Sequence, residues 1–494
     1  MTNLTGSPLK LIKNQSLFRE KGLIDGVWSN AESGDILKVL NPATGEVIGH
    51  IPKMGAMETK QAILAAKNAW PAWREKTARE RGVILRRWYE LVLANKDDLA
   101  IIMTLEQGRP IIDARNEISY SASFIDWYAE EGKRIYGDVI PQPQRDSRTI
   151  VLKEPIGVCG AITPWNMPSA MVSRKVATAL AAGCTIILKP AEQTPYSAIA
   201  LAVLAEMAGV PKGVFNLVTG DPGPIGMELT TNPLVRKITF TGSTEVGKLL
   251  MRQSSDTVKK ISFELGGNSP FLVFDDADIK KAAQDAVACK FRNSGQTCVC
   301  ANRIFVQESV YEEFLSSFIA SIKALKVGNG FDEGVTQGPL IDDMAVKKME
   351  SHVADALSNG AKLLLGGKRH ALGANFYEPT VLSNLSKQMK IYSEETFGPI
   401  AAISTFKNER EVIEMANDTE YGLAAYLYTR DIGRMFRVSE ALEVGVVGIN
   451  KGVFATEVAP FGGTKQSGIG TEGSKYGIEE YLHLKRLSIG GIDE

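Results

Sequence analysis

The stretch IGVCGAITPWNMPSAMVSRKVATALAAGCTIILKPAEQTPYSAIALAVLAEMAGVPKGVFNLVTG (156–220) alternates short apolar runs with longer runs of helical periodicity. Short apolar runs are typical of strands buried on both faces, and the longer runs predict helices that cover them. The expected strands lie at 156–162, 184–190 and 213–220, and the expected helices at 168–183 and 194–209. The first helix ends at Gly183, a residue type that commonly closes helices.

The alternation continues beyond this stretch. The next predicted elements are a short helix near 224–230, a strand at 237–242, a helix at 243–253 and a strand at 259–264. Strict alternation with short joints predicts an α/β fold, in which helices cover both faces of a parallel sheet through right-handed crossovers. Five strands in this order indicate a dinucleotide-binding sheet, whose ligands lie at the carboxyl ends of the strands.

The flanking segments predict a second α/β unit and an extended arm, and 494 residues favour two or three domains. The proline-bearing segment 136–155 is typical of an arm that leaves the core and pairs elsewhere, for example with another subunit. Two amphipathic helices are expected at 57–70 and 78–107. The second unit is expected to begin with 269–279, with helices near 279–292 and 308–326 and strands near 362–366, 380–382, 400–406 and 445–449.

Charge and hydropathy exclude several classes of protein. Lys and Arg total 56 against 57 for Asp and Glu, which provides no basic field for nucleic acid and no cationic stripe for a membrane surface. The most apolar stretch, 176–188, is too short to span a bilayer. The first twenty residues lack the apolar core of a signal peptide.

The cysteines indicate a reducing compartment, and the histidines predict that the protein has no metal site. Five cysteines at irregular spacing do not form a disulfide framework and indicate the cytoplasm. The four histidines are scattered, with no cysteine at zinc spacing nearby, so we expect no metal site. The cysteines are Cys159, Cys184, Cys289, Cys298 and Cys300.

The segment FRNSGQTCVC (291–300) contains a candidate nucleophile. Cys298 follows Gly-Gln-Thr, a small polar lead-in that can hold a sulfur at the mouth of a cleft. A thiolate is a strong nucleophile once its pKa is lowered by positive partial charge or backbone donors. Taken alone, this segment favours the other interpretation, in which Cys298 is a small buried hydrophobe.

Two further segments support the catalytic interpretation. Glu264 ends the strand of FELGGNSP (263–270), and at a strand end it faces the ligand cleft, where burial raises its pKa and suits it as a general base on water. Asn166 in TPWNMPS (163–169) lies between prolines that stiffen its loop, and its amide is a suitable donor to an oxyanion. The alternatives are a glutamate that caps the next element and an asparagine that caps the helix beginning at Ser169.

The cofactor signals are weaker, because the chain has no G-x-G-x-x-G motif. The segment FTGSTEVG (240–247) places glycines five residues apart at a strand-to-helix turn, which could hold one face of a pyrophosphate. The segment KPAEQTP (189–195) places Lys189 and Glu192 after the second strand, where an acid typically binds the adenosine ribose. A surface ion pair is the alternative for these two residues.

Eight segments together resemble the aldehyde dehydrogenase superfamily, and they occur in that family's order over nearly the whole chain. They are PWN, KPAEQTP, FTGSTEVG, ELGG, GQTC, EETFGP (394–399), NDTEYGLAA (417–425) and PFGGTKQSG (460–468). The resemblance implies an α/β fold with three parts. These are a Rossmann-like cofactor domain at 18–137 and 159–267, a catalytic domain at 268–446, and a small β oligomerisation arm at 138–158 and 477–494.

The resemblance also implies a reaction, the oxidation of an aldehyde to an acid with NADP or NAD. Cys298 resembles the nucleophile, Glu264 the base that activates the deacylating water, and Asn166 with the Cys298 backbone N–H the oxyanion hole. Hydride leaves a thiohemiacetal on the cysteine, and water hydrolyses the remaining thioester. The family arm implies a homodimer or homotetramer. The residues that resemble cofactor ligands are Trp165, Lys189, Glu192, Gly242, Ser243, Glu395 and Phe397.

Within the superfamily, FRNSGQTCVCANR and GSKYGIEEYL most resemble succinate-semialdehyde dehydrogenases, enzymes of GABA catabolism. In that subfamily two arginines, matching Arg174 and Arg292, hold the far carboxylate of the substrate, which suits the guanidinium fork. The alternative for each arginine is an internal acid partner. Thr456 stands where some relatives have serine, which leaves glutarate semialdehyde open, because one methylene is worth only about 1–3 kcal/mol of discrimination.

Two properties stay open at this level. Cys300 lies two residues beyond Cys298, and some relatives with this spacing form a reversible disulfide, so redox control is a hypothesis. For the cofactor, Glu192 would repel a 2′-phosphate if it points at the ribose, whereas the subfamily resemblance leans slightly to NADP.

Three other functions compete with this interpretation. A CoA-acylating aldehyde dehydrogenase is disfavoured by Glu264, because that branch generally lacks this base. A catalytically silent scaffold is disfavoured because Cys298, Glu264 and Asn166 are all present. A cofactor-free thiol hydrolase would need a histidine partner, and none of the four histidines lies in a candidate site loop.

Overall fold

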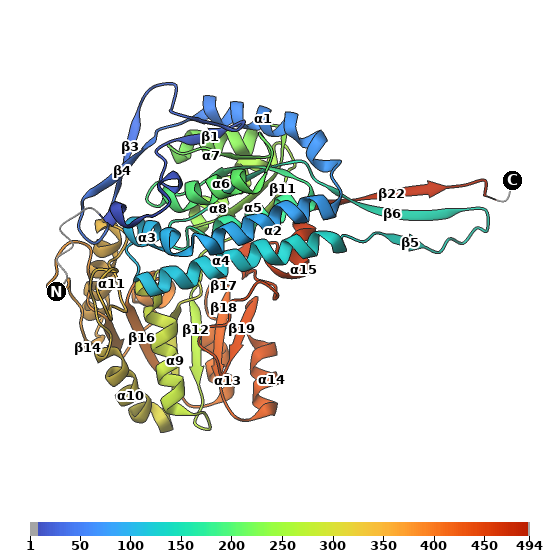
Figure 1. Ribbon diagram of the computed structural model, residues 1–494. Helices are drawn as coiled ribbons and strands as arrows, with labels where there is room; N and C mark the ends of the chain where they lie inside the picture. The colour runs from blue at the N-terminus through green and yellow to red at the C-terminus, as the bar shows by residue number, and fades with distance from the viewer. Residues whose placement is uncertain (1–7, 493–494) are drawn as a thin grey trace.

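The computed structural model describes residues 8–492 and confirms the predicted α/β class. Two α/β bodies lie one against the other, and an arm that carries the C-terminus projects from the larger one (Figure 1). The signal-peptide expectation falls partly on residues 1–7, and the predicted arm ends in 493–494; both segments lie outside the described residues. No helix within residues 8–492 combines the length and apolar character needed to cross a bilayer.

The larger body is built on a sheet of eight strands. Its five central strands are parallel and lie in the sequence order third, second, first, fourth, fifth, which is the order of dinucleotide-binding sheets. Three short antiparallel strands, which the sequence did not predict, extend its edges. Across the sheet the strands are β2 (Val27–Ser29), β1 (Gly22–Ile24), β9 (Phe215–Leu217), β8 (Thr185–Lys189), β7 (Val158–Ile162), β10 (Val235–Thr241), β11 (Lys260–Glu264) and β21 (Gly468–Ile469).

Helices cover both faces of this sheet, as the alternation predicted. One face carries α2 to α6, and the other carries α1, α7 and α8. Gly183 closes α5 in the left-handed conformation, with φ of 93°, as expected from its position. The helices are α1 (Ala56–Arg74), α2 (Ala78–Ala94), α3 (Lys96–Gln107), α4 (Ile111–Glu131), α5 (Ala170–Ala182), α6 (Pro195–Ala208), α7 (Pro222–Thr231) and α8 (Thr244–Ser255).

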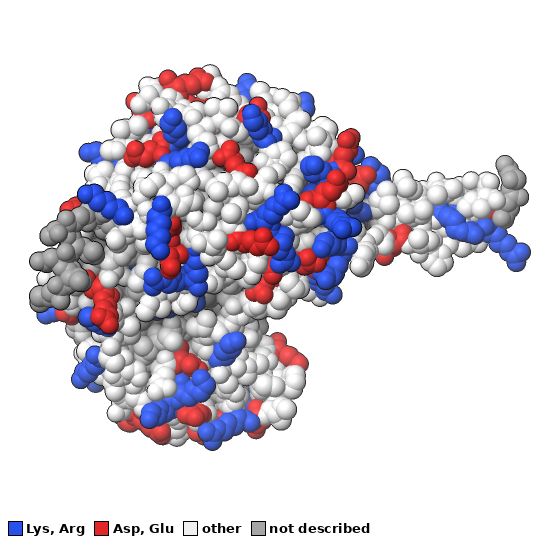
Figure 2. Space-filling view, in the orientation of Figure 1, with Lys and Arg blue, Asp and Glu red and all other residues white. Residues whose placement is uncertain are grey.

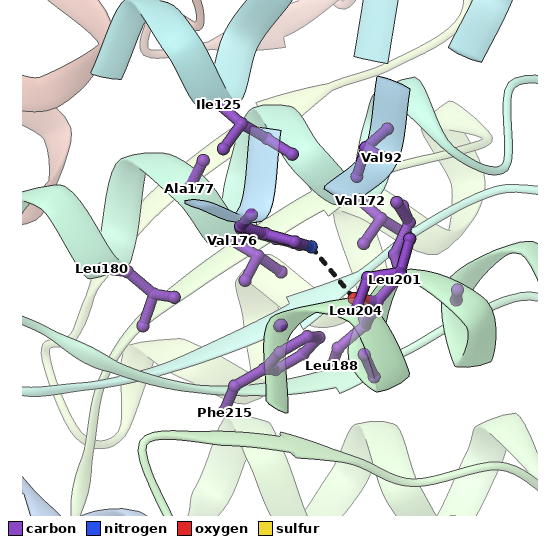
Figure 3. Close-up of a cluster of buried hydrophobic side chains, with 14 of the residues drawn as sticks. Val92, Ile125, Val172, Val176, Ala177, Leu180, Leu188, Leu201, Leu204 and Phe215 are labelled. Carbon is purple, nitrogen blue, oxygen red and sulfur yellow. Dashed lines mark hydrogen bonds between the residues drawn. The ribbon is translucent and has the colours of Figure 1, made fainter. Parts of the chain in front are cut away.

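The core beneath α5 fixes the loops at the ends of β7 and β8. Side chains from α2, α4, α5, α6 and the sheet interlock there, and every residue of α5 is buried (Figure 3). Burying each large apolar side chain contributes about 1.5–3 kcal/mol. The indole N–H of Trp88 donates to the carbonyl of Leu201 at 3.1 Å, so this buried polar atom is not left unsatisfied.

The smaller body contains a seven-stranded sheet that is parallel except at one edge. The sequence predicted its helices α9 (Ile279–Phe291) and α10 (Tyr311–Lys323) but missed its strands β13 and β18. In order across the sheet the strands are β14 (Lys362–Leu365), β15 (Thr380–Ser383), β16 (Ile400–Phe406), β13 (Ala301–Gln307), β12 (Ser269–Val273), β18 (Ala424–Tyr428) and β19 (Val446–Ile449).

The arm is a three-stranded antiparallel sheet. Its strands are β5 (Asp138–Ile140), β6 (Arg148–Pro155) and β22 (Leu482–Ile489), and β22 pairs with β6 over its full length. It extends well away from both bodies (Figure 1). On the face of the molecule seen in Figure 2, basic and acidic side chains are interspersed over both bodies. The exact domain limits given above stay a prediction.

One helix prediction was wrong. The run 78–107 is not a single helix, because α2 ends at Ala94 and α3 begins at Lys96, with Asn95 between them outside helical geometry. The asparagine side chain donates to the carbonyl of Leu91 at 2.8 Å, a bond that competes with continuation of the helix. The long helix α4, which follows Pro110, was not predicted.

Candidate active site

Two cavities meet at Cys298. The first cavity, of about 380 Å³, lies between α4, α5 and the loop that carries Cys298. The second cavity, of about 300 Å³, lies beyond the carboxyl ends of β7 and β10, where the strand order reverses. The residues that line both are Met167, Met171, Thr241 and Cys298. A reacting group at the sulfur therefore has one open space on each side.

The loop that leads to Cys298 has an unusual backbone. Asn293, Ser294 and Gly295 are all left-handed, with φ of 50°, 57° and 75°. Strained conformations of this kind cost about 1–3 kcal/mol at a non-glycine residue and persist where the surroundings enforce them. A Cβ on Gly295 would lie 2.2 Å from the carbonyl oxygen of Gly398, so this position also needs glycine for close packing. No feature of the sequence predicted the left-handed backbone at residues 293 and 294.

The Cys298 thiol is half-buried, and in the free protein its pKa is raised to about 12. Burial is the main cause, and the carboxylates of Glu395 and Glu264 add to it, while Arg174 and the backbone N–H of Cys298 itself act in the opposite direction. The free protein therefore holds the sulfur as a thiol. A positive charge or a proton acceptor brought close to it would favour the nucleophilic thiolate.

Glu264 ends β11 and lines the first cavity, as its position in the sequence predicted. Its side chain is buried, and its Oε2 has no hydrogen-bond partner in the described residues. Burial, followed by the nearby carboxylate of Glu472, raises its pKa well above the ordinary value. An unpartnered carboxyl with a raised pKa, aimed into a cavity beside a thiol, is suited to general base catalysis on water.

Asn166 lies in the loop between β7 and α5, and its amide lies against the Cys298 loop. The Nδ2 group donates to the carbonyl of Gln296 at 3.0 Å. A side-chain amide has two N–H donors, so one fixes the side chain on the loop and the second remains for another acceptor. This arrangement suits a donor to an oxyanion formed next to the sulfur.

The second cavity contains most of the predicted cofactor residues: Trp165, Gly242, Ser243, Glu395 and Phe397. The rings of Trp165 and Phe397 lie perpendicular with centroids 5.4 Å apart. The Oε1 atom of Glu395 accepts from the backbone N–H of Gly267 at 2.9 Å. Burial raises the pKa of Glu395 to about 7, against the effect of that N–H and of Lys348. A Cβ at Gly266 would lie 2.9 Å from its other oxygen, so the glycine keeps that oxygen accessible.

Gly242 and Ser243 line this cavity, whereas Lys189 and Glu192 lie outside its lining. Gly242 and Ser243 precede α8, and the Ser243 hydroxyl caps the helix by accepting from the N–H of Val246 at 3.3 Å. Lys189 ends β8 and pairs with Glu192 at 2.7 Å, but neither residue lines the cavity. The carboxyl ends of β7, β8, β10 and β11 thus lie together on one side of the sheet, the arrangement that binds dinucleotides.

The comparison with known families agrees with this geometry. The model of the aldehyde dehydrogenase family matches residues 28–487. The chain belongs to the aldehyde dehydrogenase family. This confirms the resemblance seen in the eight sequence segments and the predicted fold.

Individual members of the aldehyde dehydrogenase family match over almost their whole length. A glutarate-semialdehyde dehydrogenase from Pseudomonas aeruginosa is 59% identical, covering 97% of this chain and 100% of that protein. A succinate-semialdehyde dehydrogenase [NADP(+)] from Escherichia coli is also 59% identical, covering 97% of this chain and 99% of that protein. The solved structure of betaine aldehyde dehydrogenase from Staphylococcus aureus in complex with NAD+ has a TM-score of 0.95 at 35% identity, covering 99% of this chain and 97% of that chain.

Of the two arginines singled out in this aldehyde dehydrogenase, Arg174 already has protein partners. Its Nη1 pairs with Glu472 at 3.3 Å, and its Nη2 donates to the hydroxyl of Tyr120 at 2.7 Å. The guanidinium also lies 4.8 Å from the ring centroids of Phe124 and Phe461. Its buried Nε has no partner in the described residues. Arg174 lines the first cavity, but its charge is paired with an acid of the protein and both of its terminal nitrogens already donate to protein groups.

Arg292 has a different environment. It also lines the first cavity, and within residues 8–492 no carboxylate lies within ion-pair distance of its guanidinium. Burial raises the pKa of Asp113, another lining residue, while the charges of Arg109 and then Arg292 act in the opposite direction. Thr456 does not line the cavity, and its hydroxyl donates to Glu457 at 3.2 Å. Val453 and Ala455 line the cavity instead.

Cys300 is buried behind the site and lines neither cavity. The ammonium of the fully buried Lys290 donates to its sulfur at 3.1 Å and to the Asn302 amide oxygen at 3.1 Å. Redox pairing with Cys298 stays a hypothesis. Within the described residues, no group of three or more His, Cys, Asp or Glu side chains could hold a metal.

Several cavity residues were missed by sequence reasoning. They are Arg109 in the turn between α3 and α4, and Asp113, Glu117 and Tyr120 in the first turns of α4. Their sequence, GRPIIDARNEISY (108–120), shows only an ordinary mixture of charged and apolar residues. The Gly-Arg-Pro turn was the one available signal, since charged residues fixed in a turn beside a helix are frequently functional.

Proposed function

We propose that this aldehyde dehydrogenase oxidises an aldehyde with a distal carboxylate, succinate semialdehyde foremost, to the acid with NADP or NAD. The observation that carries the proposal is the Arg292 guanidinium, which faces the cavity beside Cys298 without an acid in ion-pair distance. A carboxylate on the substrate can bind it through a charged pair of hydrogen bonds. The relatives from Pseudomonas aeruginosa and Escherichia coli act, by their names, on semialdehydes of dicarboxylic acids.

The residues on the two sides of Cys298 supply the steps of the reaction. The Cys298 thiol first loses its proton to solvent. The thiolate adds to the aldehyde carbon, and the oxyanion receives hydrogen bonds from the free N–H of Asn166 and the backbone N–H of Cys298. After the carbon has lost its hydride, a thioester remains on the sulfur. Glu264 takes a proton from water, which attacks this thioester, and the thiolate leaves. In total one aldehyde and one water yield one carboxylate, one hydride and two protons.

The second cavity fits a nicotinamide dinucleotide. When bound, that cofactor accepts the hydride. The N–H groups at the start of the twelve-residue helix α8 suit a phosphate, and the carboxylate of Glu395 suits ribose hydroxyls. Lys189 and Glu192 would lie toward the adenosine ribose, with the lysine available to a 2′-phosphate and the glutamate to free hydroxyls. The pair is compatible with both NADP and NAD.

Glutarate semialdehyde is the second candidate substrate. The wall formed by Val453 and Ala455 is apolar, and the Thr456 hydroxyl is turned to Glu457 rather than to the cavity. That wall therefore offers no hydroxyl whose position would restrict where the substrate carboxylate lies. One methylene more or less changes binding by only about 1–3 kcal/mol.

The arm and the family resemblance support proposals about how the protein assembles and where it is located. We propose a homodimer or homotetramer joined through the arm, whose strands expose Val139, Leu484 and Ile489 to solvent in the single chain. We further propose a cytoplasmic enzyme that removes the aldehyde formed in GABA catabolism. The division into a cofactor domain, a catalytic domain and an arm is proposed with the limits stated from the sequence.

The proposal is tested by following reduced-nicotinamide absorbance with succinate semialdehyde, glutarate semialdehyde and an uncharged aldehyde, using NAD and NADP separately and no CoA. We expect Cys298→Ala to be inactive with all three. We expect Arg292→Gln to lower kcat/KM for the carboxylated substrates about 10- to 150-fold, the value of a charged hydrogen bond of about 1.5–3 kcal/mol, with little change for the uncharged one.

The matched control is Arg115→Gln, an exposed arginine of α4 that pairs with Asp97 outside the cavity. It should leave all three substrates unaffected. If Arg292→Gln impaired the charged and uncharged aldehydes equally, the carboxylate assignment would be wrong while the thioester chemistry would stand.

A further inference from the structure

A buried ion pair lies directly behind the oxyanion donor. Arg109 follows α3 in the Gly-Arg-Pro turn and is 5% exposed, and Glu117 of α4 is 3% exposed. The Arg109 guanidinium bonds in three directions: its Nε donates to Gln107 Oε1 at 3.1 Å, its Nη1 pairs with Glu117, and its Nη2 donates to the backbone carbonyl of Asn166. The first cavity therefore has an arginine whose donors face the protein.

The partner acid holds the other end of the same loop. The Oε1 atom of Glu117 accepts from the backbone N–H of Ser169 at 3.0 Å and of Ala170 at 3.2 Å, at the start of α5. The ion pair thus fixes the loop at residue 166 through the arginine and at residues 169 and 170 through the glutamate. Negative charge at the start of a helix is also favourable to the helix.

The Cys298 loop is tied into the same cluster. The amide of Asn293 donates to the Asn166 carbonyl at 3.0 Å, and its oxygen accepts from Gln107 Nε2 at 2.9 Å. The Asn166 amide in turn donates to the carbonyl of Gln296 at 3.0 Å. The carbonyl of Asn166 therefore receives donors from two sides, while its side chain reaches the loop of the nucleophile.

We propose that Arg109 is a positioning residue that acts through the Asn166 carbonyl to hold the oxyanion-donating amide against the sulfur of Cys298. The inference rests on the proposed function, in which Asn166 stabilises the oxyanion. Arginine is needed because its planar group has five donors in fixed directions, whereas the single ammonium of lysine cannot reach three acceptors with the same geometry. The donor of an oxyanion hole must be held in place before the reaction begins.

A purely structural ion pair would also join α4 to α5, so a stability measurement does not distinguish the two roles. A double-mutant cycle does, because two residues that act through one group show a non-additive effect. The cycle combines Arg109→Lys with Asn166→Ala and uses an uncharged aldehyde, so that the result is independent of how a substrate carboxylate binds. The readouts are kcat, KM and the thermal midpoint of each variant.

We expect Arg109→Lys to lower kcat/KM at least tenfold in the wild-type background, mainly through kcat, and less than twofold in the Asn166→Ala background. The thermal midpoint should fall by the same amount in both. Equal loss of kcat/KM in the two backgrounds would overturn the proposal and leave the pair with a structural role only. A wild-type rate for Asn166→Ala alone would instead refute the oxyanion assignment on which the proposal rests.

Two further variants complete the test. Glu117→Gln keeps an oxygen for the N–H groups of Ser169 and Ala170 but loses the ion pair with Arg109. If Arg109→Lys does not fold, Glu117→Gln replaces it in the double-mutant cycle with Asn166→Ala. Arg81→Lys is the matched control, because Arg81 is also buried and donates to the carbonyls of Ala181 and Lys76, far from the site. We expect its effect on kcat/KM to be equal in both Asn166 backgrounds.

Discussion

The two cavities that meet at Cys298 differ in how their charges are arranged. The second cavity is lined by strand ends, glycines and a helix start, with one carboxyl at Glu395. Of the three arginines that line the first cavity, two are paired with an acid of the protein, Arg109 with Glu117 and Arg174 with Glu472, and Arg292 is the exception among the described residues. Backbone elements bind what all members of a fold share, whereas an uncompensated side-chain charge selects a particular substrate.

The largest effect is expected at Glu264, which lies on the wall of the first cavity and which we propose acts after hydride loss. Glu264→Gln keeps the shape of the side chain but cannot take a proton from water, so we expect the thioester to accumulate. The steady-state rate should fall about 10²- to 10⁴-fold, the usual contribution of general base catalysis, while one equivalent of reduced cofactor still forms in a rapid burst. Rapid-mixing absorbance measures both phases.

In Glu264→Gln, the burst shows whether activity is lost before or after the hydride leaves the substrate. Loss of the burst along with the steady-state rate would show that Glu264 is needed before hydride loss, which contradicts its assignment as the base for deacylation. Cys298→Ala provides the baseline, because it has no sulfur to acylate.

A smaller effect is expected at Arg174, and it contrasts with that at Arg292. Arg174 lowers the pKa of both Glu264 and Cys298. Arg174→Gln removes this positive charge, so both pKa values should rise and the acid limb of the kcat/KM profile should move to higher pH. We expect a loss of about tenfold near neutral pH with charged and uncharged aldehydes alike, which a profile over pH 6 to 10 measures.

If Arg174→Gln spared the uncharged aldehyde entirely, Arg174 would instead be a carboxylate ligand equivalent to Arg292. In the comparison of the two cavities, the first would then contain two arginines, Arg174 and Arg292, that bind the substrate carboxylate. An unchanged pH profile would contradict the electrostatic role directly.

The smallest expected effect is on cofactor affinity in the second cavity. The pKa of Glu395 is raised to about 7 by burial, so its carboxyl is ionised above this pH and protonated below it. An ionised oxygen is the stronger hydrogen-bond acceptor, and NAD affinity should therefore fall several-fold as the pH decreases from 8 to 6. The Kd for NAD, measured from protein fluorescence, should become independent of pH in Glu395→Gln. The same slope in that variant would assign the titration to another group.

Much of the fold was predictable, because strand and helix patterns are local properties. The five parallel strands, the glycine that closes α5 and the position of Glu264 at the end of a strand all follow from short-range periodicity. The edge strands β1, β2 and β21 were not predicted, since strands of two or three residues carry no readable alternation. The break at Asn95 was missed because an asparagine within an amphipathic run interrupts it only through a side-chain bond.

For the site, sequence alone identified the family and the residues at its motifs, because motif residues and their order are properties of the chain itself. Only the tertiary structure distinguished Arg174, held by Glu472 and Tyr120, from Arg292, which has no such partner in the described residues. It alone also placed Arg109 and Glu117 behind Asn166, more than forty residues away along the chain. Whether a charge is compensated depends on which distant groups the fold brings within a few ångströms, and no local pattern contains that information.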